Sequence, residues 1–273
     1  MNIERRTQNV ELRTASHPCQ LHTGAGDTQV TRHGFSLTEV LLAVGILAVG
    51  MLFIAGVFPV SIHFTTVATE RTIAATVADE AFAKIKLYGV PVGLSDANQA
   101  LYAPAVVPYT EYAYPSTPTA DPNSKRYWWS AICRSVPGSL TDVQVTVFVS
   151  RKVGMTTTYY TRNPLPPENL VPINRPVPVF VSVTAGSGAN EIVTSDTLGL
   201  SNFINDGYTI VDDKTGDIYR ILDRTGNVVR LDKNWAGSIS QWVWTIPAPV
   251  SFPPSGTSGR YPCIGVYQKI IRF

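Results

Sequence analysis

The stretch that decides the fold runs from Val40 to Phe58 and reads VLLAVGILAVGMLFIAGVF, without a charged side chain. At about 1.5 Å per residue, a helix of this length spans ~28 Å, close to the ~30 Å thickness of the hydrocarbon core of a bilayer. The core helix of a soluble protein would show a polar face, and this stretch has none. The pattern therefore predicts a membrane-spanning helix.

A cleaved secretory signal peptide is the main alternative, because such a peptide also carries an apolar run near the N-terminus. Here about 39 residues precede the run, a longer lead than these peptides usually have. In addition, Glu39 lies at the entrance to the run, where a carboxylate is costly and therefore indicates a function. We expect the apolar helix to stay in the mature chain as an anchor.

The residues around this entrance are Gly34-Phe35-Ser36-Leu37-Thr38-Glu39-Val40-Leu41-Leu42-Ala43. They resemble the cleavage and methylation motif of type IV pilins and type II secretion pseudopilins. The resemblance implies that a prepilin peptidase cuts between Gly34 and Phe35, and that the new terminal residue, Phe35, is N-methylated. A glycine before the cut also lets a protease approach the backbone closely, and the apolar helix that follows agrees with the motif.

The same resemblance implies a role for Glu39, which pairs in this family with the terminal amine of a neighbouring subunit. Such pairing would offset the cost of burying the carboxylate and would set the axial register of a filament. The alternative is an unpaired carboxylate at the level of the lipid headgroups. The implied partners are prepilin peptidase, other pilin or pseudopilin subunits, the inner-membrane assembly platform and the membrane itself.

Residues 1–34 form a leader peptide in this interpretation. The leader is longer than the short basic leaders of pseudopilins, and its four arginines and three acidic residues give it a net charge of only +1. Arg32 and His33 lie beside the cut, on the side expected to face the cytoplasm. A mis-assigned start and a genuinely long leader are both compatible with this segment.

Helical periodicity continues beyond the apolar run. Pro59 is expected to kink the helix rather than end it, Glu80 and Lys84 form an i,i+4 pair, and Gly89 ends the helix. One long helix over 35–88 is therefore predicted, apolar in its first half and amphipathic in its second. The apolar positions of the second half recur at i, i+3 and i+4 spacing and are Ala74, Val77, Ala78, Ala81, Phe82 and Ile85.

The rest of the chain is rich in strand and turn signals. We expect an α+β fold in which the long helix packs on an antiparallel, β-rich, pilin-like head spanning 89–161. Within this head, Tyr127–Arg134 and Val143–Val149 are predicted to pair as antiparallel strands. Six prolines between 162 and 178 predict an extended, polyproline-like connector.

A β-rich C-terminal lobe is predicted over 179–273, with its clearest strand pattern between 179 and 246. Asp-Lys-Thr-Gly and Asp-Arg-Thr-Gly turns separate three short strand patterns in this lobe. The three patterns form a predicted meander and cover Tyr208–Val211, Ile218–Leu222 and Val228–Leu231.

The cysteines allow one disulfide in the exported part. Cys19 lies in the leader, which leaves Cys133 and Cys263, and an even pair in an exported domain predicts a bond between them. The alternative is two separate buried thiols, because spacing alone does not define the geometry that a disulfide needs.

Two other groups of residues, the aspartates of the meander and the tryptophans, are candidate binding sites. Asp206, Asp212, Asp213, Asp217 and Asp223 cluster around the meander. The resemblance to pseudopilins, some of which bind calcium in their heads, makes a calcium site the weaker alternative. The spacing is not that of an EF-hand and aspartate is an ordinary turn residue, so turn roles are predicted and no metal site. Five tryptophans offer a carbohydrate-binding face as the weaker alternative to a core role. They are Trp128, Trp129, Trp235, Trp242 and Trp244.

Composition argues against an enzyme and against a nucleic-acid partner. The formal net charge of +2 gives no basic surface of the kind that binds nucleic acid. Three of the four histidines precede residue 34, so the rest of the chain has only one histidine for a catalytic triad or a metal site. No phosphate loop or nucleophile motif is present, and nothing in the sequence joins the carboxylates of Glu111, Glu168 and Glu191. We therefore expect no catalytic residue, no cofactor and no metal.

These observations predict a structural subunit, a minor pilin or pseudopilin, of a type II secretion pseudopilus or a type IV pilus. It is expected in the inner membrane as a single-pass protein, with its head in the periplasm or on a surface filament. The alternative is a membrane-tethered binding or enzymatic domain that uses a pilin-type anchor. The motif does not distinguish secretion, piliation and DNA uptake.

Overall fold

The computed structural model describes residues 34–91, 93–104, 106–116, 121, 124–139, 141–153, 158–163, 169–195, 199–238, 240–249 and 260–273. The chain divides into two compact units, Met1–Val57 and Phe58–Phe273. Of the predicted leader over 1–34, only Gly34 lies within the described residues.

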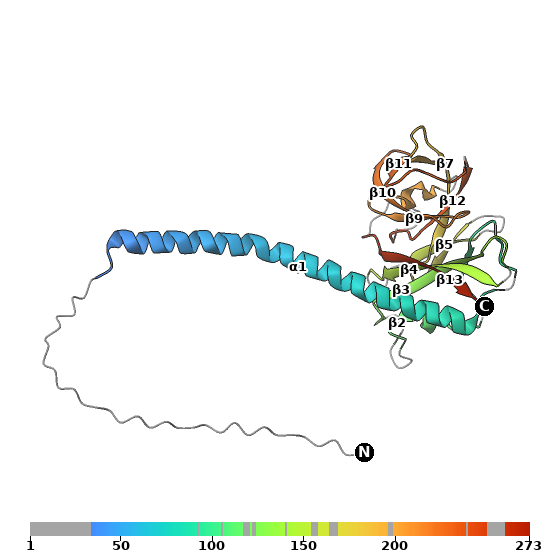
Figure 1. The fold of residues 1–273 in the computed structure, drawn as a ribbon, viewed down its shortest axis with the longest axis horizontal. Coiled ribbons are helices and arrows are strands. Elements are labelled where there is room, and N and C mark those ends of the chain that lie inside the picture. The colour runs from blue at the N-terminus through green and yellow to red at the C-terminus, as the bar shows by residue number, and fades with distance from the viewer. Residues whose placement is uncertain are drawn as a thin grey trace, which may run out of the picture. The chain divides into compact units, whose positions relative to one another are not determined.

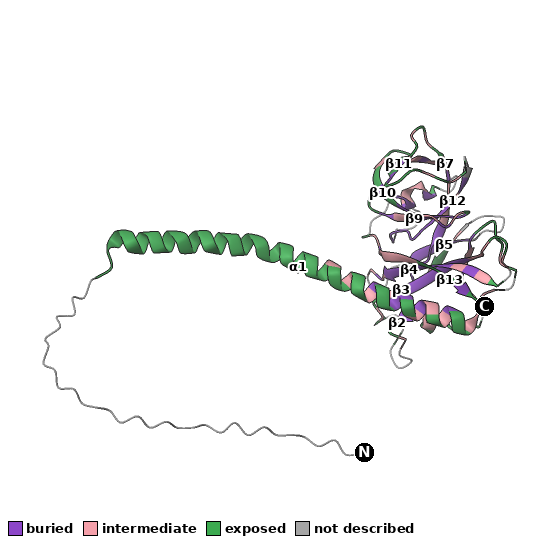
Figure 2. Cartoon of the chain, viewed as in Figure 1, coloured by how far each residue is buried: buried purple, intermediate pink, exposed green. Residues whose placement is uncertain are grey.

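Helix α1, Leu37–Tyr88, confirms the predicted helix over 35–88 (Figure 1). Ser36 caps its first turn, because Ser36 Oγ accepts a hydrogen bond from the Glu39 backbone N–H at 3.2 Å. Within the first unit every residue from 34 to 57 is exposed (Figure 2). The most apolar window of α1 has a mean hydropathy of 2.8 and is not buried at all, so the helix is long and apolar enough to span a membrane.

In the second unit, α1 continues past Pro59 and becomes amphipathic, as predicted. Five of the six predicted apolar positions are buried, whereas Phe82 is only partly buried against the same cluster. Gly89 adopts a φ of 79° and its N–H donates to the Ile85 carbonyl at 2.9 Å, which ends the helix in the left-handed conformation that glycine tolerates best.

An antiparallel sheet packs against this half of α1. Its strands are β1 (Ala100–Leu101), β3 (Tyr127–Ser135), β4 (Asp142–Arg151) and β13 (Cys263–Arg272), in the order β1-β3-β4-β13, and β2 (Ala113–Tyr114) also pairs with β3. The predicted pairing of β3 with β4 is confirmed. Alternation along β4 directs its valines to the core beneath the helix and Phe148 to the opposite face. The coarse α+β prediction is thus confirmed.

The predicted lobe over 179–273 is wrong at its C-terminal end. Strand β13 belongs to the head sheet, where it pairs with β4 along nearly its whole length, from Cys263 opposite Ser150 to Arg272 opposite Asp142. Its apolar alternation is local, but its partner strand lies more than a hundred residues earlier in the chain. The sequence pattern identified neither that partner nor the sheet to which β13 belongs.

The remainder of the predicted lobe forms a closed barrel, inserted between β4 and β13. Its strands follow the order β10-β11-β8-β7-β12-β9 and include the predicted meander. Their bounds are β7 (Val179–Ala185), β8 (Glu191–Thr194), β9 (Thr209–Asp212), β10 (Ile218–Thr225), β11 (Val228–Leu231) and β12 (Ser240–Thr245). Alternating valines, isoleucines and leucines fill the barrel, together with the short helix η3 (Leu200–Phe203).

The predicted connector over 162–178 is also corrected. A β-hairpin of β5 (Tyr159–Asn163) and β6 (Asn169–Ile173) occupies much of it, with Pro172 opposite Tyr160. Proline is tolerated at the edge of a two-stranded sheet because a backbone N–H can be spared there. Residues 164–168, which hold three of the six prolines, lie outside the described residues.

Candidate functional site

The N-terminal motif lies in an exposed segment at the start of α1. Gly34, Phe35 and Glu39 are all exposed, and Phe35 exposes 80% of its surface. The sequence signal for the cap formed by Ser36 is the S-x-x-E spacing of a capping box in Ser36-Leu37-Thr38-Glu39. The cap begins the helix just after the predicted cut and leaves the Gly34–Phe35 bond outside the helix.

The predicted disulfide is contradicted. Cys133 and Cys263 are both free thiols, and Cys133 faces the core beneath α1 whereas Cys263 packs on the other side of the sheet. On β4 their partners are Val145 and Ser150, five residues apart. This offset corresponds to ~17 Å along the strand, and a disulfide needs Cα atoms within about 7 Å.

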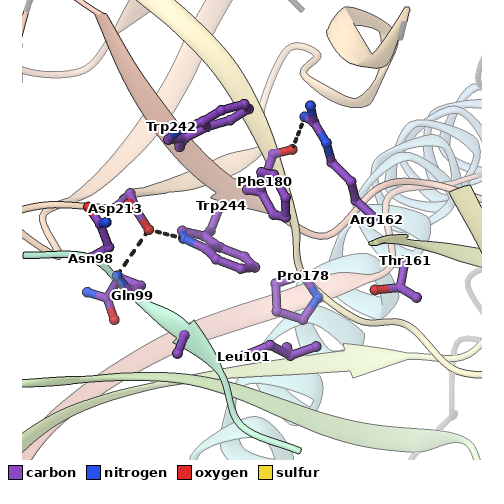
Figure 3. A pocket seen from close by; sticks show the side chains of 11 residues that line it. Asn98, Gln99, Leu101, Thr161, Arg162, Pro178, Phe180, Asp213, Trp242 and Trp244 are labelled. Carbon is purple, nitrogen blue, oxygen red and sulfur yellow. Dashed lines mark hydrogen bonds between the residues drawn. The ribbon is translucent and has the colours of Figure 1, made fainter. Parts of the chain in front are cut away.

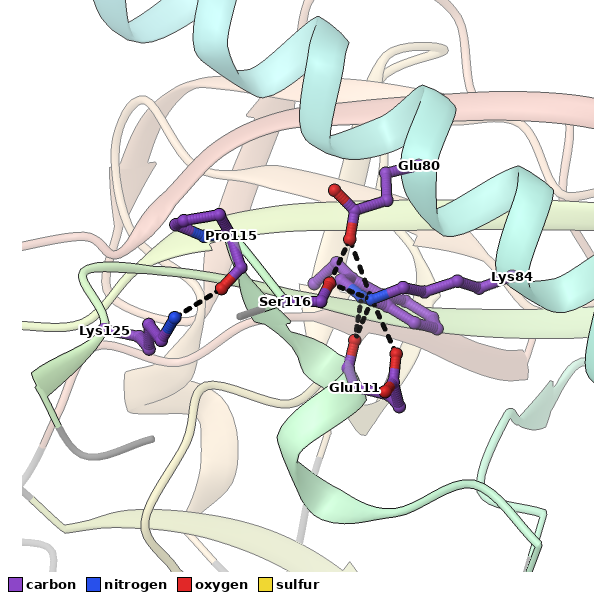
Figure 4. A network of polar contacts seen from close by, with 7 residues as sticks. Glu80, Lys84, Glu111, Pro115, Ser116 and Lys125 are labelled. Carbon is purple, nitrogen blue, oxygen red and sulfur yellow. Dashed lines mark hydrogen bonds and ion pairs between the residues drawn. The ribbon is translucent and has the colours of Figure 1, made fainter. Parts of the chain in front are cut away.

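A polar cluster joins α1 to the head (Figure 4). Lys84 Nζ lies 2.8 Å from Glu80 Oε1 and 3.0 Å from Glu111 Oε2, and it also donates to the Glu111 carbonyl at 2.8 Å. The hydroxyl of Ser116 bonds both Lys84 and Glu80. The i,i+4 pair predicted on the polar face of the helix is therefore a half-buried clamp. Helix η1 (Tyr109–Tyr112), which carries Glu111, completes it.

A second ion pair joins the same helix to the sheet. Arg151 at the end of β4 bonds Glu70, and both side chains are less than 15% exposed. Glu70 precedes the apolar contact surface of α1, which begins at Ala74 and ends at Ile85, whereas Glu80 and Lys84 lie within the second half of that surface's length. Together the two ion pairs fix the register of the helix on the sheet.

A cavity of about 460 Å³ lies where the barrel meets the head sheet (Figure 3). Strand β1 supplies Leu101, the hairpin supplies Thr161 and Arg162, and the barrel supplies Phe180 and the two tryptophans of β12. The volume falls within the range of small-molecule sites.

Two charged groups face the cavity, and both are held by the protein. The Asp213 carboxylate accepts hydrogen bonds from the Trp244 indole at 2.6 Å and from the Gln99 backbone N–H at 3.1 Å. Burial raises the pKa of Asp213, and these two hydrogen bonds oppose the rise. The Arg162 guanidinium carbon lies 4.5 Å from the ring centre of Phe180 and 4.8 Å from that of Trp242, and Nη1 donates to the Phe180 carbonyl at 3.0 Å.

The aspartates of the meander have separate roles. Asp212 accepts hydrogen bonds from the backbone N–H groups of Lys214 and Thr215, which makes it a turn residue. Asp206 and Asp223 are exposed, and Asp217 accepts a hydrogen bond from the Thr215 hydroxyl. No group of three or more histidine, cysteine, aspartate or glutamate side chains suited to a metal ion occurs among the described residues.

The five tryptophans separate into three groups. Trp128 and Trp129 are core residues beneath α1, and Trp235 packs on Tyr219 at the barrel. Only Trp242 and Trp244 line the cavity. The five tryptophans therefore do not form one binding face. The sequence alone does not show which of them are buried, because burial depends on which sheet each strand joins.

Of the three carboxylates Glu111, Glu168 and Glu191, the two that the structure describes lie in different parts of the fold. Glu111 bonds Lys84, and Glu191 accepts a hydrogen bond from the Gly188 N–H at 2.9 Å in a turn of the barrel. Glu168 lies outside the described residues. Comparison of the chain with protein-family models, curated proteins and solved structures finds no match.

Proposed function

We propose that this protein is a structural subunit, a minor pilin or pseudopilin, of a type II secretion pseudopilus or a type IV pilus. Prepilin peptidase cuts between Gly34 and Phe35, and Phe35 becomes the N-methylated terminus. The mature chain sits in the inner membrane by the first half of α1, with its head in the periplasm or on a surface filament.

One observation carries the proposal: the motif directly precedes an apolar helix that the described residues leave exposed. Such a surface needs either lipid or other helices around it, because exposed apolar area is unfavourable in water. A filament subunit meets this need at each stage, because lipid surrounds its helix before assembly and neighbouring helices surround it afterwards. The clamp at Lys84 and the ion pair at Glu70 attach the helix firmly to the head, which a filament subunit requires.

Glu39 acts in assembly rather than in folding. In the folded chain its backbone N–H bonds Ser36 while the side chain stays exposed, so nothing in the head depends on it. Inside a helical bundle its carboxylate would be desolvated, and the terminal amine of an adjacent Phe35 would neutralise it.

The deciding experiment is N-terminal mass spectrometry of the full chain from the membrane fraction of a bacterium with a prepilin peptidase. We expect a chain that begins at N-methylated Phe35. Gly34→Leu should block the cut because its side chain obstructs the approach to the backbone, whereas the matched change Gly45→Leu, inside the helix, should not. A chain that begins after residue 58, or one that keeps residues 1–34, contradicts the proposal.

The same preparation tests Glu39 by co-purification with the other filament subunits. Glu39→Gln should keep processing and membrane insertion but lower recovery in the filament fraction at least about tenfold, equivalent to ~1.4 kcal/mol. Asp79→Asn removes a charge from an exposed position on the same helix and serves as the control. Equal recovery of the two variants contradicts the role of Glu39.

A further inference from the structure

The cavity between barrel and head sheet exists only because the barrel is inserted into the head. One wall is strand β1 of the head sheet, and the opposite wall is the β7–β12 side of the barrel. The amphipathic half of α1 packs on the other face of the sheet. The cavity is therefore free of the structural role proposed for the helix.

The barrel wall is aromatic and held in place. The Phe180 ring meets Trp242 edge to face, with centres 5.1 Å apart, and its centre lies 5.3 Å from that of Trp244. The Arg162 side chain, only 6% exposed, stacks on two of these rings, and the bond to Asp213 fixes the Trp244 indole. A wall with so little freedom loses little conformational entropy when it binds a ligand.

Polar groups with unused hydrogen-bonding capacity lie along the same cavity. Within the described part of the chain, the Trp242 indole N–H and the Thr161 hydroxyl have no hydrogen-bond partner. The Gln99 side chain is 6% exposed, yet neither its amide nitrogen nor its amide oxygen is bonded. In Figure 3, Gln99 and Asp213 lie to one side of Trp244, with Thr161 and Arg162 to the other. Buried polar atoms without partners, such as those of Gln99, are rare in proteins. Thr161 and Trp242 are only partly buried, and all three residues can offer a hydrogen bond to a ligand.

The charges of the cavity favour a ligand without net charge. Asp213 and Arg162 contribute one group of each sign, and neither sign predominates in the lining. A phosphate or a carboxylate would meet the Asp213 side chain, and a cation would meet the guanidinium that already covers Phe180 and Trp242. A neutral ring with one apolar face and hydroxyl groups around its edge fits both the aromatic wall and the polar ends.

We propose that this cavity binds a pyranose sugar, whose apolar C–H face contacts the aromatic wall formed by Phe180, Trp242 and Trp244 while its hydroxyls bond Thr161, Gln99 and the Trp242 N–H. The sugar is either a free monosaccharide or the end unit of a glycan. Binding is separate from assembly, so a subunit that fails to assemble still binds.

The test uses the purified full chain in a detergent without a sugar headgroup. Methyl glycosides of glucose, galactose, mannose and N-acetylglucosamine serve as probes, followed by saturation-transfer NMR and by tryptophan fluorescence. At least one of them should bind with transfer to its ring C–H protons. A β-linked disaccharide of the same sugar then distinguishes the end of a glycan, which binds more tightly, from a free monosaccharide, which does not.

Variants locate the site. Trp242→Ala should weaken binding at least about tenfold, whereas Trp235→Ala, a matched change at the barrel outside the cavity, should leave it unchanged. Thr161→Val keeps the shape of the side chain and should weaken binding about fivefold through the lost hydroxyl.

The proposal fails if none of the four glycosides binds, if Trp235→Ala weakens binding as much as Trp242→Ala, or if Thr161→Val changes nothing. It also fails if indole or a nucleoside binds at the cavity while every sugar is refused. Thermal unfolding of each variant shows that the barrel is folded, and Thr161→Val decides the matter where Trp242→Ala does not fold.

Discussion

At the scale of single residues, the contact between helix and head places side chains in surroundings that the sequence does not predict. Glu80 and Lys84 form an ordinary helical pair in the sequence. In the fold, Lys84 is 12% exposed and also holds both the carboxylate and the backbone carbonyl of Glu111. Its ammonium group neutralises two half-buried carboxylates, so its energetic role exceeds that of a surface pair.

Replacement of this lysine should therefore weaken the joint. Lys84→Met keeps most of the side-chain volume but leaves Glu80 and Glu111 facing each other without a cation, and we expect a loss of ~2 kcal/mol in the free energy of unfolding. Urea unfolding of the head in detergent micelles, followed by tryptophan fluorescence, measures it. Lys86→Met, on an exposed position, should cost less than about 0.5 kcal/mol. Similar losses in the two variants would mean that the clamp contributes nothing.

The buried thiol of Cys133 should make stability depend on alkaline pH. Burial raises the pKa of Cys133 from 9.0 to about 12, so the folded chain keeps the proton after the unfolded chain has released it. The stabilisation is complete below about pH 9. It is lost as the pH rises from about 9 to about 12, by up to about 1.4 kcal/mol per pH unit. In urea unfolding between about pH 8 and pH 11, the wild-type chain should lose stability more steeply than Cys133→Ala. Tyrosines titrate in both chains, so only a difference between the two curves of stability against pH reports on Cys133. Parallel curves would contradict the prediction.

At the scale of elements, local sequence predicted well what local forces determine. The helix was predicted within two residues of its observed start, and its end at Tyr88 follows from Gly89. Strands β3 and β4 were predicted because a Pro-Gly turn joins neighbouring alternating runs. In contrast, the β5–β6 hairpin was missed, since its prolines indicated an extended connector more strongly than its few apolar residues indicated strands.

At the scale of the whole molecule, the C-terminal strand closes the head and the barrel is an insertion. Ile264, Tyr267 and Ile271 of β13 pack into the core beneath α1. The barrel instead covers the other face of the sheet, where Ile132 and Phe148 meet Val211, Trp244 and Ile246. The two parts of the predicted lobe over 179–273 therefore contribute to different hydrophobic cores.

This division predicts opposite outcomes for two deletions. Excision of 179–246 through a short Gly-Ser linker should leave α1 and the sheet folded, though less stable, because only the outer face of the sheet loses its cover. Truncation after Pro262 removes β13 and should abolish the head, with protease resistance of the membrane-embedded chain falling at least about tenfold. A resistant truncated chain beside a degraded excised one would show that the barrel, not β13, completes the head.

The sequence by itself determined the apolar helix, its amphipathic continuation, its glycine stop and the neighbouring strands, because each depends on periodicity and turn chemistry within a few residues. The motif on which the proposed processing depends is equally local, and the functional proposal rests on it together with the exposed apolar helix that follows it. Only the tertiary structure decided the place of β13, the separation of Cys133 from Cys263, and the cavity lined by Trp242 and Thr161. These features depend on pairings between segments far apart in the chain. Such pairings are selected by strand register and burial, and no local sequence pattern encodes them.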